Sequence, residues 1–95
     1  MAGYLIFDIE ITDQTAYDAY KASAGPILAR HGGRFLVRAG KLESLEGGWR
    51  PTRFFVVEFD SYDKAREFYF SDDYQAAVKQ RQASSNSKAF LVDGV

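Results

Sequence analysis

His31, the only histidine of the chain, is the residue best suited to acid–base chemistry. It follows an apolar segment and comes directly before Gly32 and Gly33, a pair that is typical of a helix end. Because the ordinary pKa of histidine lies near neutral pH, its imidazole is a candidate catalytic base. The structural alternative is that His31 caps the helix end or packs beside Leu28.

Arg38 and Arg53 are candidates for binding a carboxylate, because a guanidinium group offers a bidentate pair of donors that lysine lacks. The alternative for both is a structural ion pair with Glu58, Glu46 or Asp60. For Arg38 the expected partner is Glu58 on the neighbouring strand, where the pair would fix the register of the sheet.

Three further side chains are candidates for ligand binding. Trp49 follows a Gly-Gly pair in a loop, where its indole either closes over a ligand or packs across a subunit contact. Tyr69 lies near a helix end and offers a hydroxyl that orients a ligand, although helical spacing predicts core packing for Tyr69 and Tyr74 alike. Glu58 is also a candidate for ligand binding if the charged residues on its face of the sheet line a cavity.

Composition excludes several classes of chemistry. The chain has no cysteine, which removes disulfides, thiolate nucleophiles and iron–sulfur ligation. With one histidine and no clustered ligand spacing, we expect no metal. The chain has no phosphate-binding glycine loop, no dinucleotide turn and no nucleophile elbow, and we expect no cofactor. The net charge is −1 with scattered lysines and arginines, and we expect no nucleic-acid partner.

A membrane partner is not expected either. No segment approaches the roughly 18 consecutive apolar residues of a membrane span. The start of the chain lacks a basic region followed by a long apolar stretch, which favours a cytoplasmic protein. With 46% hydrophobic and 16% aromatic residues, the 95 residues are expected to fold as a single domain over 1–95.

Hydrophobic periodicity predicts the elements that must position these side chains. The first half should hold a strand over 3–11, a helix over 13–24 that presents Tyr17 and Tyr20, and, after a break at Gly25-Pro26, a short helix to 31. A strand over 34–38, continued through 41–46, and a strand over 53–59 should follow. The rest should hold helices that begin near Ser61 and Ser71, a loop over 83–87 and a strand over 88–92. The last helix presents Tyr74, Ala77, Val78 and Arg81 on one face.

This order predicts an α+β chain of ferredoxin-like βαββαβ topology, in which a four-stranded antiparallel sheet carries its helices on one face. The strands over 3–11 and 53–59 should be central. Alternation assigns eight apolar residues to the side that faces the helices: Leu5, Phe7, Ile9, Phe35, Val37, Phe55, Val57 and Phe59.

The opposite side of the sheet predicts a homodimer. Tyr4, Ile6, Leu36, Phe54 and Val56 would leave a large apolar patch in water, and no other segment remains to cover it. A second copy packed sheet against sheet would form a dimeric α/β barrel. The charged residues on the same face would then either pair or line a cavity; they are Asp8, Glu10, Arg34, Arg38 and Glu58.

The segments HGGRFLVRAG, LEGGWRPTRFFVVEFDS and FYFSDDYQAAVKQR occur in this order and resemble the family called domain of unknown function 1330. With the first strand and helix, the likeness covers nearly the whole chain. It implies a dimeric α/β barrel of ferredoxin-like fold and no established activity. The family pattern has two glycines after the arginine of the second strand, where this chain has Ala39 and Gly40. More distant relatives by fold include antibiotic-biosynthesis monooxygenases, haem-degrading monooxygenases and small lactone isomerases.

Two functional hypotheses follow. The first is a cofactor-free enzyme that acts on a small apolar or aromatic acid between sheet and helices, with His31 as base and Arg38 as anchor. The second is a non-catalytic module that holds a small molecule or contacts another protein. Haem degradation is a weaker third idea, since Asn86, Trp49 and His31 are suitable residue types whose positions do not match that family's arrangement.

Overall fold

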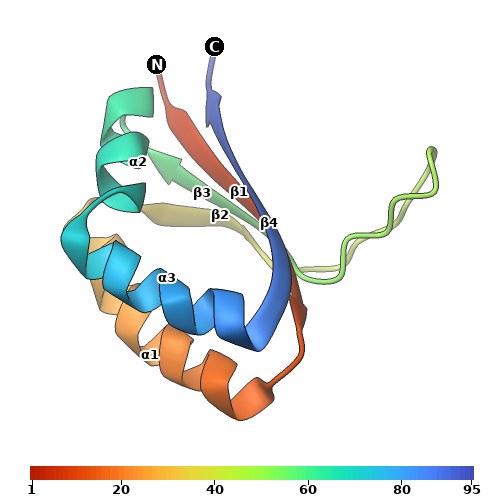
Figure 1. Cartoon of the computed structure of the whole chain (residues 1–95). Helices are drawn as coiled ribbons and strands as arrows, with labels where there is room; N and C mark the ends of the chain where they lie inside the picture. Colours follow the sequence, from red (N-terminus) through yellow and green to blue (C-terminus); the bar gives the residue numbers. More distant parts are fainter.

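Four strands and three helices form two layers, with the helices packed on one face of the sheet (Figure 1). The computed structural model describes residues 1–95. The elements are β1 (Gly3–Ile11), α1 (Gln14–Arg30), β2 (Arg34–Arg38), β3 (Phe54–Phe59), α2 (Tyr62–Tyr69), α3 (Asp72–Ser84) and β4 (Ser85–Asp93). The antiparallel order β2-β3-β1-β4 confirms the predicted ferredoxin-like fold with β1 and β3 at the centre.

The three helices begin where side-chain oxygens can cap them. Asp13, Ser61 and Ser71 each accept a hydrogen bond from the backbone amide three residues further on, which satisfies a donor that the first turn leaves free. The predicted start of each helix near these residues is confirmed. No helix of the chain is both long enough and apolar enough to cross a membrane.

Helix α1 runs without interruption through Pro26, so the expected break at Gly25-Pro26 is wrong. Proline removes one backbone donor and strains the preceding turn, at a cost of about 3 kcal/mol. Five α1 residues buried against the rest of the molecule outweigh that cost, since burying each large apolar side chain contributes roughly 1.5–3 kcal/mol. They are Tyr17, Tyr20, Ala24, Ile27 and Leu28.

A β-bulge in β2 reverses the predicted orientation of its last residues. Phe35 pairs with Val57, but Val37 pairs with Val56 instead of the residue that regular alternation requires. The extra residue shifts the pleat by one position. Val37 therefore lies on the open face of the sheet and Arg38 on the face covered by the helices, opposite to the expectation for both.

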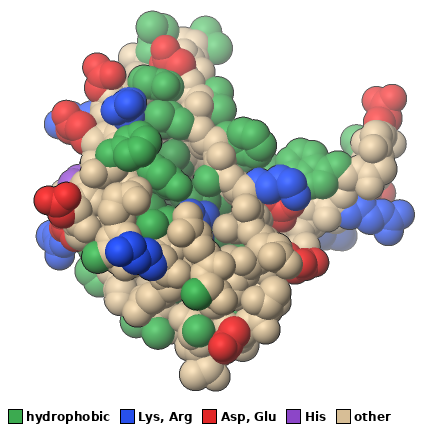
Figure 2. Space-filling view, viewed as in Figure 1, with side chains coloured by type: hydrophobic (Ala, Val, Ile, Leu, Met, Phe, Trp, Pro, Cys, Tyr) green, Lys and Arg blue, Asp and Glu red, His purple; other side chains and the backbone are tan.

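Residues 40–52, here called the arm, form no strand and extend away from the two layers (Figure 1). The predicted continuation of the second strand through residues 41–46 is therefore wrong. Gly47 and Gly48 both have positive φ and turn the chain within the arm, a conformation that glycine adopts without steric cost. Acidic, basic and hydrophobic side chains all occur along the arm (Figure 2).

Helix α3 passes directly into β4. The loop that the sequence predicted over residues 83–87 is therefore absent, and that prediction is wrong. The hydroxyls of Ser84 and Ser85 donate to the Arg81 carbonyl, and Ser84 also donates to the carbonyl of Gln80. These bonds satisfy acceptors that the last turn of the helix leaves free. Small polar residues, which resemble a loop in sequence, thus serve as a compact helix end.

Candidate functional site

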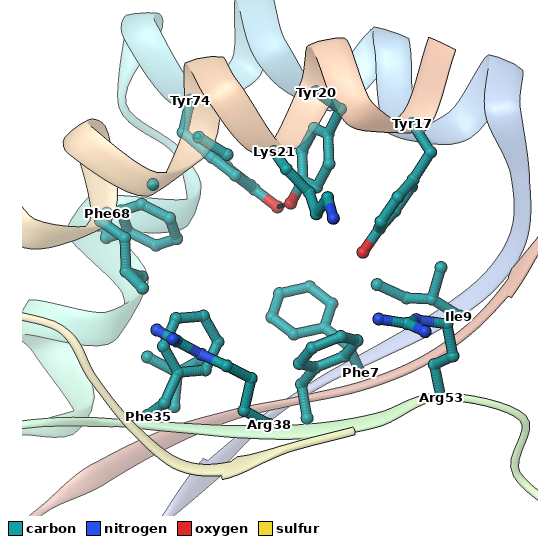
Figure 3. Close-up of a pocket in the computed structure, with 15 residues that line it drawn as sticks. Phe7, Ile9, Tyr17, Tyr20, Lys21, Phe35, Arg38, Arg53, Phe68 and Tyr74 are labelled. Atoms are coloured by element: carbon teal, nitrogen blue, oxygen red, sulfur yellow. Dashed lines mark hydrogen bonds between the residues drawn. The ribbon is translucent and has the colours of Figure 1, made fainter. Parts of the chain in front are cut away.

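A cavity of about 340 Å³ lies between helix α1 and the covered face of the sheet, and 11 of its 15 lining residues are hydrophobic. Strands β1, β2 and β3 form its floor, and tyrosines from α1 and α3 form its roof (Figure 3). The volume falls within the range of small-molecule sites, which are typically apolar clefts with a few fixed polar groups. Its polar groups therefore define what it can bind.

All three charged residues that line the cavity are cations: Lys21, Arg38 and Arg53. Exposed Lys21 and Arg38 mark its open side, and the β2 bulge brings Arg38 there. The Arg38 guanidinium carbon lies 4.1 Å from the centre of the Phe35 ring, within cation–π distance. No aspartate or glutamate lines the cavity, which gives its interior a net positive charge.

Three phenol groups reach into the cavity from the helices. The hydroxyls of Tyr20 and Tyr74 lie 2.8 Å apart and share a hydrogen bond, so the hydroxyl that accepts keeps its own proton free to donate to a further acceptor (Figure 3). Burial raises the pKa of Tyr20 and of Tyr74 above the ordinary value. The hydroxyl of Tyr17 points toward the Arg53 side of the cavity (Figure 3).

Two arginines at that side carry buried donors without acceptors. Nε of Arg53 has no hydrogen-bond partner, and neither Nε nor Nη1 of Arg81 has one. Arg81 is only 2% exposed, and its guanidinium carbon lies 5.0 Å from the centre of the Phe7 ring, which forms part of the cavity wall. Burial raises the pKa of Tyr17, and the positive charges of Arg53 and Arg81 oppose that rise; the charge of Arg81 opposes the rise at Tyr20 and Tyr74 as well.

His31 lies outside the cavity. It caps the C-terminus of α1, where its amide bonds to the carbonyls of Ile27 and Leu28, and its ring packs edge-on against Phe68 at 5.6 Å. This is the structural alternative that the sequence left open. Tyr69 also stays outside and packs against Tyr74, with 5.5 Å between ring centres.

Glu58 pairs with Arg34 at 2.8 Å, and Arg34 also contacts Asp60 at 3.2 Å. The expected pair between Arg38 and Glu58 is wrong, because the bulge places the two side chains on opposite faces of the sheet. Arg53 forms no ion pair with an acid of the chain. Of the proposed ligand-binding residues, Arg38 and Arg53 are thus the two that meet at the cavity.

Trp49 lies on the open face of the sheet. Its indole N–H donates to the Asp8 carboxylate at 3.2 Å, the amide of Thr52 donates to the same carboxylate at 2.9 Å, and its ring meets Phe54 edge-on. These bonds fasten the base of the arm to β1. Trp49 and Asn86 line a smaller polar cavity of about 290 Å³ there, and His31 is not among its lining residues, so the three haem-degradation candidates do not converge.

Sequence reasoning did not select Tyr17, Tyr20, Tyr74 or Arg81 as site residues, because helical spacing assigned them all to the core. One signal was available for Arg81. A charged residue that continues the apolar face begun by Tyr74 has to be buried, and a buried charge requires a partner.

The fold and the cavity together define a ferredoxin-like α+β protein with an apolar, positively charged cavity between sheet and helices. The profile of the family described as Domain of unknown function (DUF1330) matches residues 2–95. The chain belongs to this family, as the resemblance of its sequence predicted. No curated protein matches the chain.

Solved structures show the same fold. The chain is similar to a protein of unknown function from Rhodopseudomonas palustris, at 21% identity and a TM-score of 0.78 over 99% of this chain and 82% of that chain. A dimeric protein of unknown function and ferredoxin-like fold from Bacteroides fragilis matches at 13% identity and a TM-score of 0.62, over 98% of this chain and 96% of that chain. SnoaB, a cofactor-independent oxygenase from Streptomyces nogalater, matches at 14% identity and a TM-score of 0.59, over 99% of this chain and 91% of that chain. At these identities the likeness establishes the fold alone.

The buried tyrosine pair predicts a loss of stability in alkali. Because folding raises the pKa of Tyr20 and Tyr74 above their ordinary value of 10.0, ionisation favours the unfolded chain. The associated stabilisation is complete below pH 10.0 and is lost as the pH rises above it. The free energy of unfolding, measured by denaturant titration between about pH 9 and pH 11, should therefore fall less steeply with pH for the double variant Tyr20→Phe/Tyr74→Phe than for the unsubstituted protein. Tyr62→Phe, which alters an exposed tyrosine, is the control; a decline equally steep in the double variant would contradict the assignment.

Proposed function

We propose that the cavity binds a small, mainly aromatic acid and that the protein acts on this ligand without a cofactor. The observation that carries the proposal is the lining of the cavity, which combines hydrophobic side chains with three cations and no carboxylate. Such a lining favours a ligand with an apolar body and an anionic group.

Arg38 is the proposed anchor for the carboxylate. Its guanidinium lies at the open side of the cavity and forms no ion pair with an acid of the chain, so its donors are available to a ligand. Stacking on Phe35 holds the guanidinium plane and reduces the entropy lost when a carboxylate binds. Lys21 adds a second positive charge to the lining; its ammonium lies 5.9 Å from the centre of the Tyr17 ring and pairs with exposed Asp18 at 3.5 Å.

The likeness to SnoaB, described as a cofactor-independent oxygenase, supports an enzymatic role at the level of fold. A different observation favours the second candidate, a module that holds its ligand without chemistry. The cavity lining includes no histidine and no carboxylate, and burial raises the pKa of its tyrosines, so no group of the lining is an effective base at neutral pH. Turnover of a bound ligand separates the two candidates.

Calorimetric titration with 1-naphthoate and with its neutral analogue 1-naphthylmethanol tests the proposal. We expect the acid to bind at least about tenfold more tightly, because a charge-assisted pair with arginine contributes roughly 1.5–3 kcal/mol. Arg38→Met should remove most of that preference and retain the alcohol's affinity. Arg66→Met, an exposed arginine of α2, is the control. Equal affinities for acid and alcohol in the unsubstituted protein, or no binding of either, would contradict the proposal.

We also propose that residues 1–95 form one domain that pairs as a homodimer through the open face of the sheet. Four apolar side chains on that face are between 39% and 54% exposed: Leu36, Val37, Phe90 and Val92. Tyr4, Ile6, Phe54 and Val56 continue the patch across the central strands. The description of the Bacteroides fragilis protein as dimeric supports the same arrangement.

Light scattering coupled to gel filtration tests the homodimer. Phe90→Glu places a charge within the proposed contact, beside Ile6, and should convert a dimer to a monomer at micromolar concentration, because an unpaired buried charge is costly. Phe70→Glu changes a phenylalanine that follows α2 and is 57% exposed, compared with 49% for Phe90, and should leave the dimer intact. A monomeric unsubstituted protein, or a dimeric Phe90→Glu variant, would overturn the proposed interface.

A further inference from the structure

The inner side of the cavity holds more positive charge than the chain itself neutralises. Arg53 is half-buried and Arg81 is almost fully buried, and neither forms an ion pair. Three of their donor nitrogens are buried with no acceptor. Stacking of Arg81 on Phe7 compensates part of its charge but satisfies none of its N–H donors.

These charges converge on one place. Tyr17 and Arg53 both line the cavity, and the Tyr17 hydroxyl points toward the Arg53 side (Figure 3). Arg81 lies behind the wall that Phe7 forms, and its charge acts on the hydroxyl of Tyr17 as it does on those of Tyr20 and Tyr74. A ligand oxygen at this place would contact Arg53 and the Tyr17 hydroxyl, while Arg81 would act through its field.

We propose that this side of the cavity is an oxyanion site that stabilises the phenolate or enolate form of the ligand. The inference rests on the proposed function and narrows its ligand class to hydroxy-aromatic or enolisable acids. Arg38 holds the carboxylate at the opening, and Arg53, Tyr17 and Arg81 favour negative charge on an oxygen at the other end, where the Lys21 ammonium lies 5.9 Å from the centre of the Tyr17 ring.

The chemical step is a deprotonation. In a hydroxy-aromatic ligand the O–H bond breaks heterolytically and the electron pair remains on the oxygen. In an enolisable ligand the C–H bond next to the carbonyl breaks and the electron pair moves onto the carbonyl oxygen. In both cases the proton passes to a water molecule that reaches the open cavity. No base from the chain is required, because the site lowers the pKa of the ligand instead of supplying an acceptor. Arg53 and Tyr17 touch the oxygen; Arg81 is a positioning residue that acts through its charge.

Spectrophotometric titration of bound 4-nitrophenol tests the oxyanion site, because the phenolate of this probe absorbs visible light and the phenol does not. The cations facing it are Lys21, Arg38, Arg53 and Arg81, and the facing phenols are those of Tyr17, Tyr20 and Tyr74. We expect the pKa of the bound probe to lie about one to two units below that of the free probe. An apolar cavity without this site would raise it.

Arg53→Met and Arg81→Met should each return the pKa of the bound probe toward or above its free value, with the larger change for Arg53→Met. Arg81→Lys, which keeps the charge, should retain part of the shift, and Lys79→Met, an exposed change on the same helix, should retain all of it. A probe that binds without a lowered pKa, or a lowered pKa that persists in both methionine variants, overturns the oxyanion site alone. Absence of binding by both 4-nitrophenol and 1-naphthoate overturns the proposed function with it.

Discussion

A buried positive charge without a counter-ion is the constraint around which the interior of this protein is organised. Transfer of an unpaired ion into a protein interior costs several kcal/mol even after relaxation. Arg81 is 2% exposed, contacts the face of Phe7 and has no acidic partner. A core built for stability alone would carry an apolar side chain at this position of α3. The cavity adjoins this charge across the Phe7 ring, and an anion bound there would balance it through its field.

A second local feature determines which charges reach the same cavity. The bulge in β2 adds one residue to the strand, and this single residue moves Arg38 from the open face to the cavity. Glu58 consequently pairs with Arg34 and not with Arg38, which leaves the Arg38 guanidinium available. On the other face, Asp8 binds Trp49 and Thr52 and so fastens the arm at the point where the chain enters β3. The bulge thus places Arg38 on the face that lines the cavity and Val37 on the open face of the sheet.

Period-two alternation, capping residues and element order were sufficient to predict the sheet, its central strands and the helix starts. These features depend on local sequence and on the side of each strand that must be buried. The bulge was not predictable in the same way, because the residue types of Arg34 to Arg38 fit a strand equally well with or without an extra residue that shifts its alternation. The break predicted at Pro26 was wrong for a related reason. Proline tends to end a helix, but the packing of both halves of α1 on the sheet outweighs this local tendency.

The site was predicted only in part. Arg38 and Arg53 were selected for the chemistry of their guanidinium groups, and both line the cavity. His31 was selected as the only histidine, but its place at a helix end is set by Gly32 and Gly33 and lies outside the cavity. Tyr17, Tyr20 and Tyr74 have the spacing of core residues, and periodicity cannot distinguish a side chain that fills the core from one that borders a cavity within it.

The free energy of unfolding of Arg81→Met, measured by denaturant titration in a buffer free of organic acids, tests most directly whether this charge serves a ligand or the fold. Methionine keeps an unbranched apolar chain against Phe7 and removes the unpaired charge. If Arg81 is retained for an anion that the chain does not supply, the variant should be as stable as the unsubstituted protein or more stable by about 1–4 kcal/mol. A loss of roughly 2 kcal/mol or more would show that Arg81 stabilises the fold itself and would contradict the central claim.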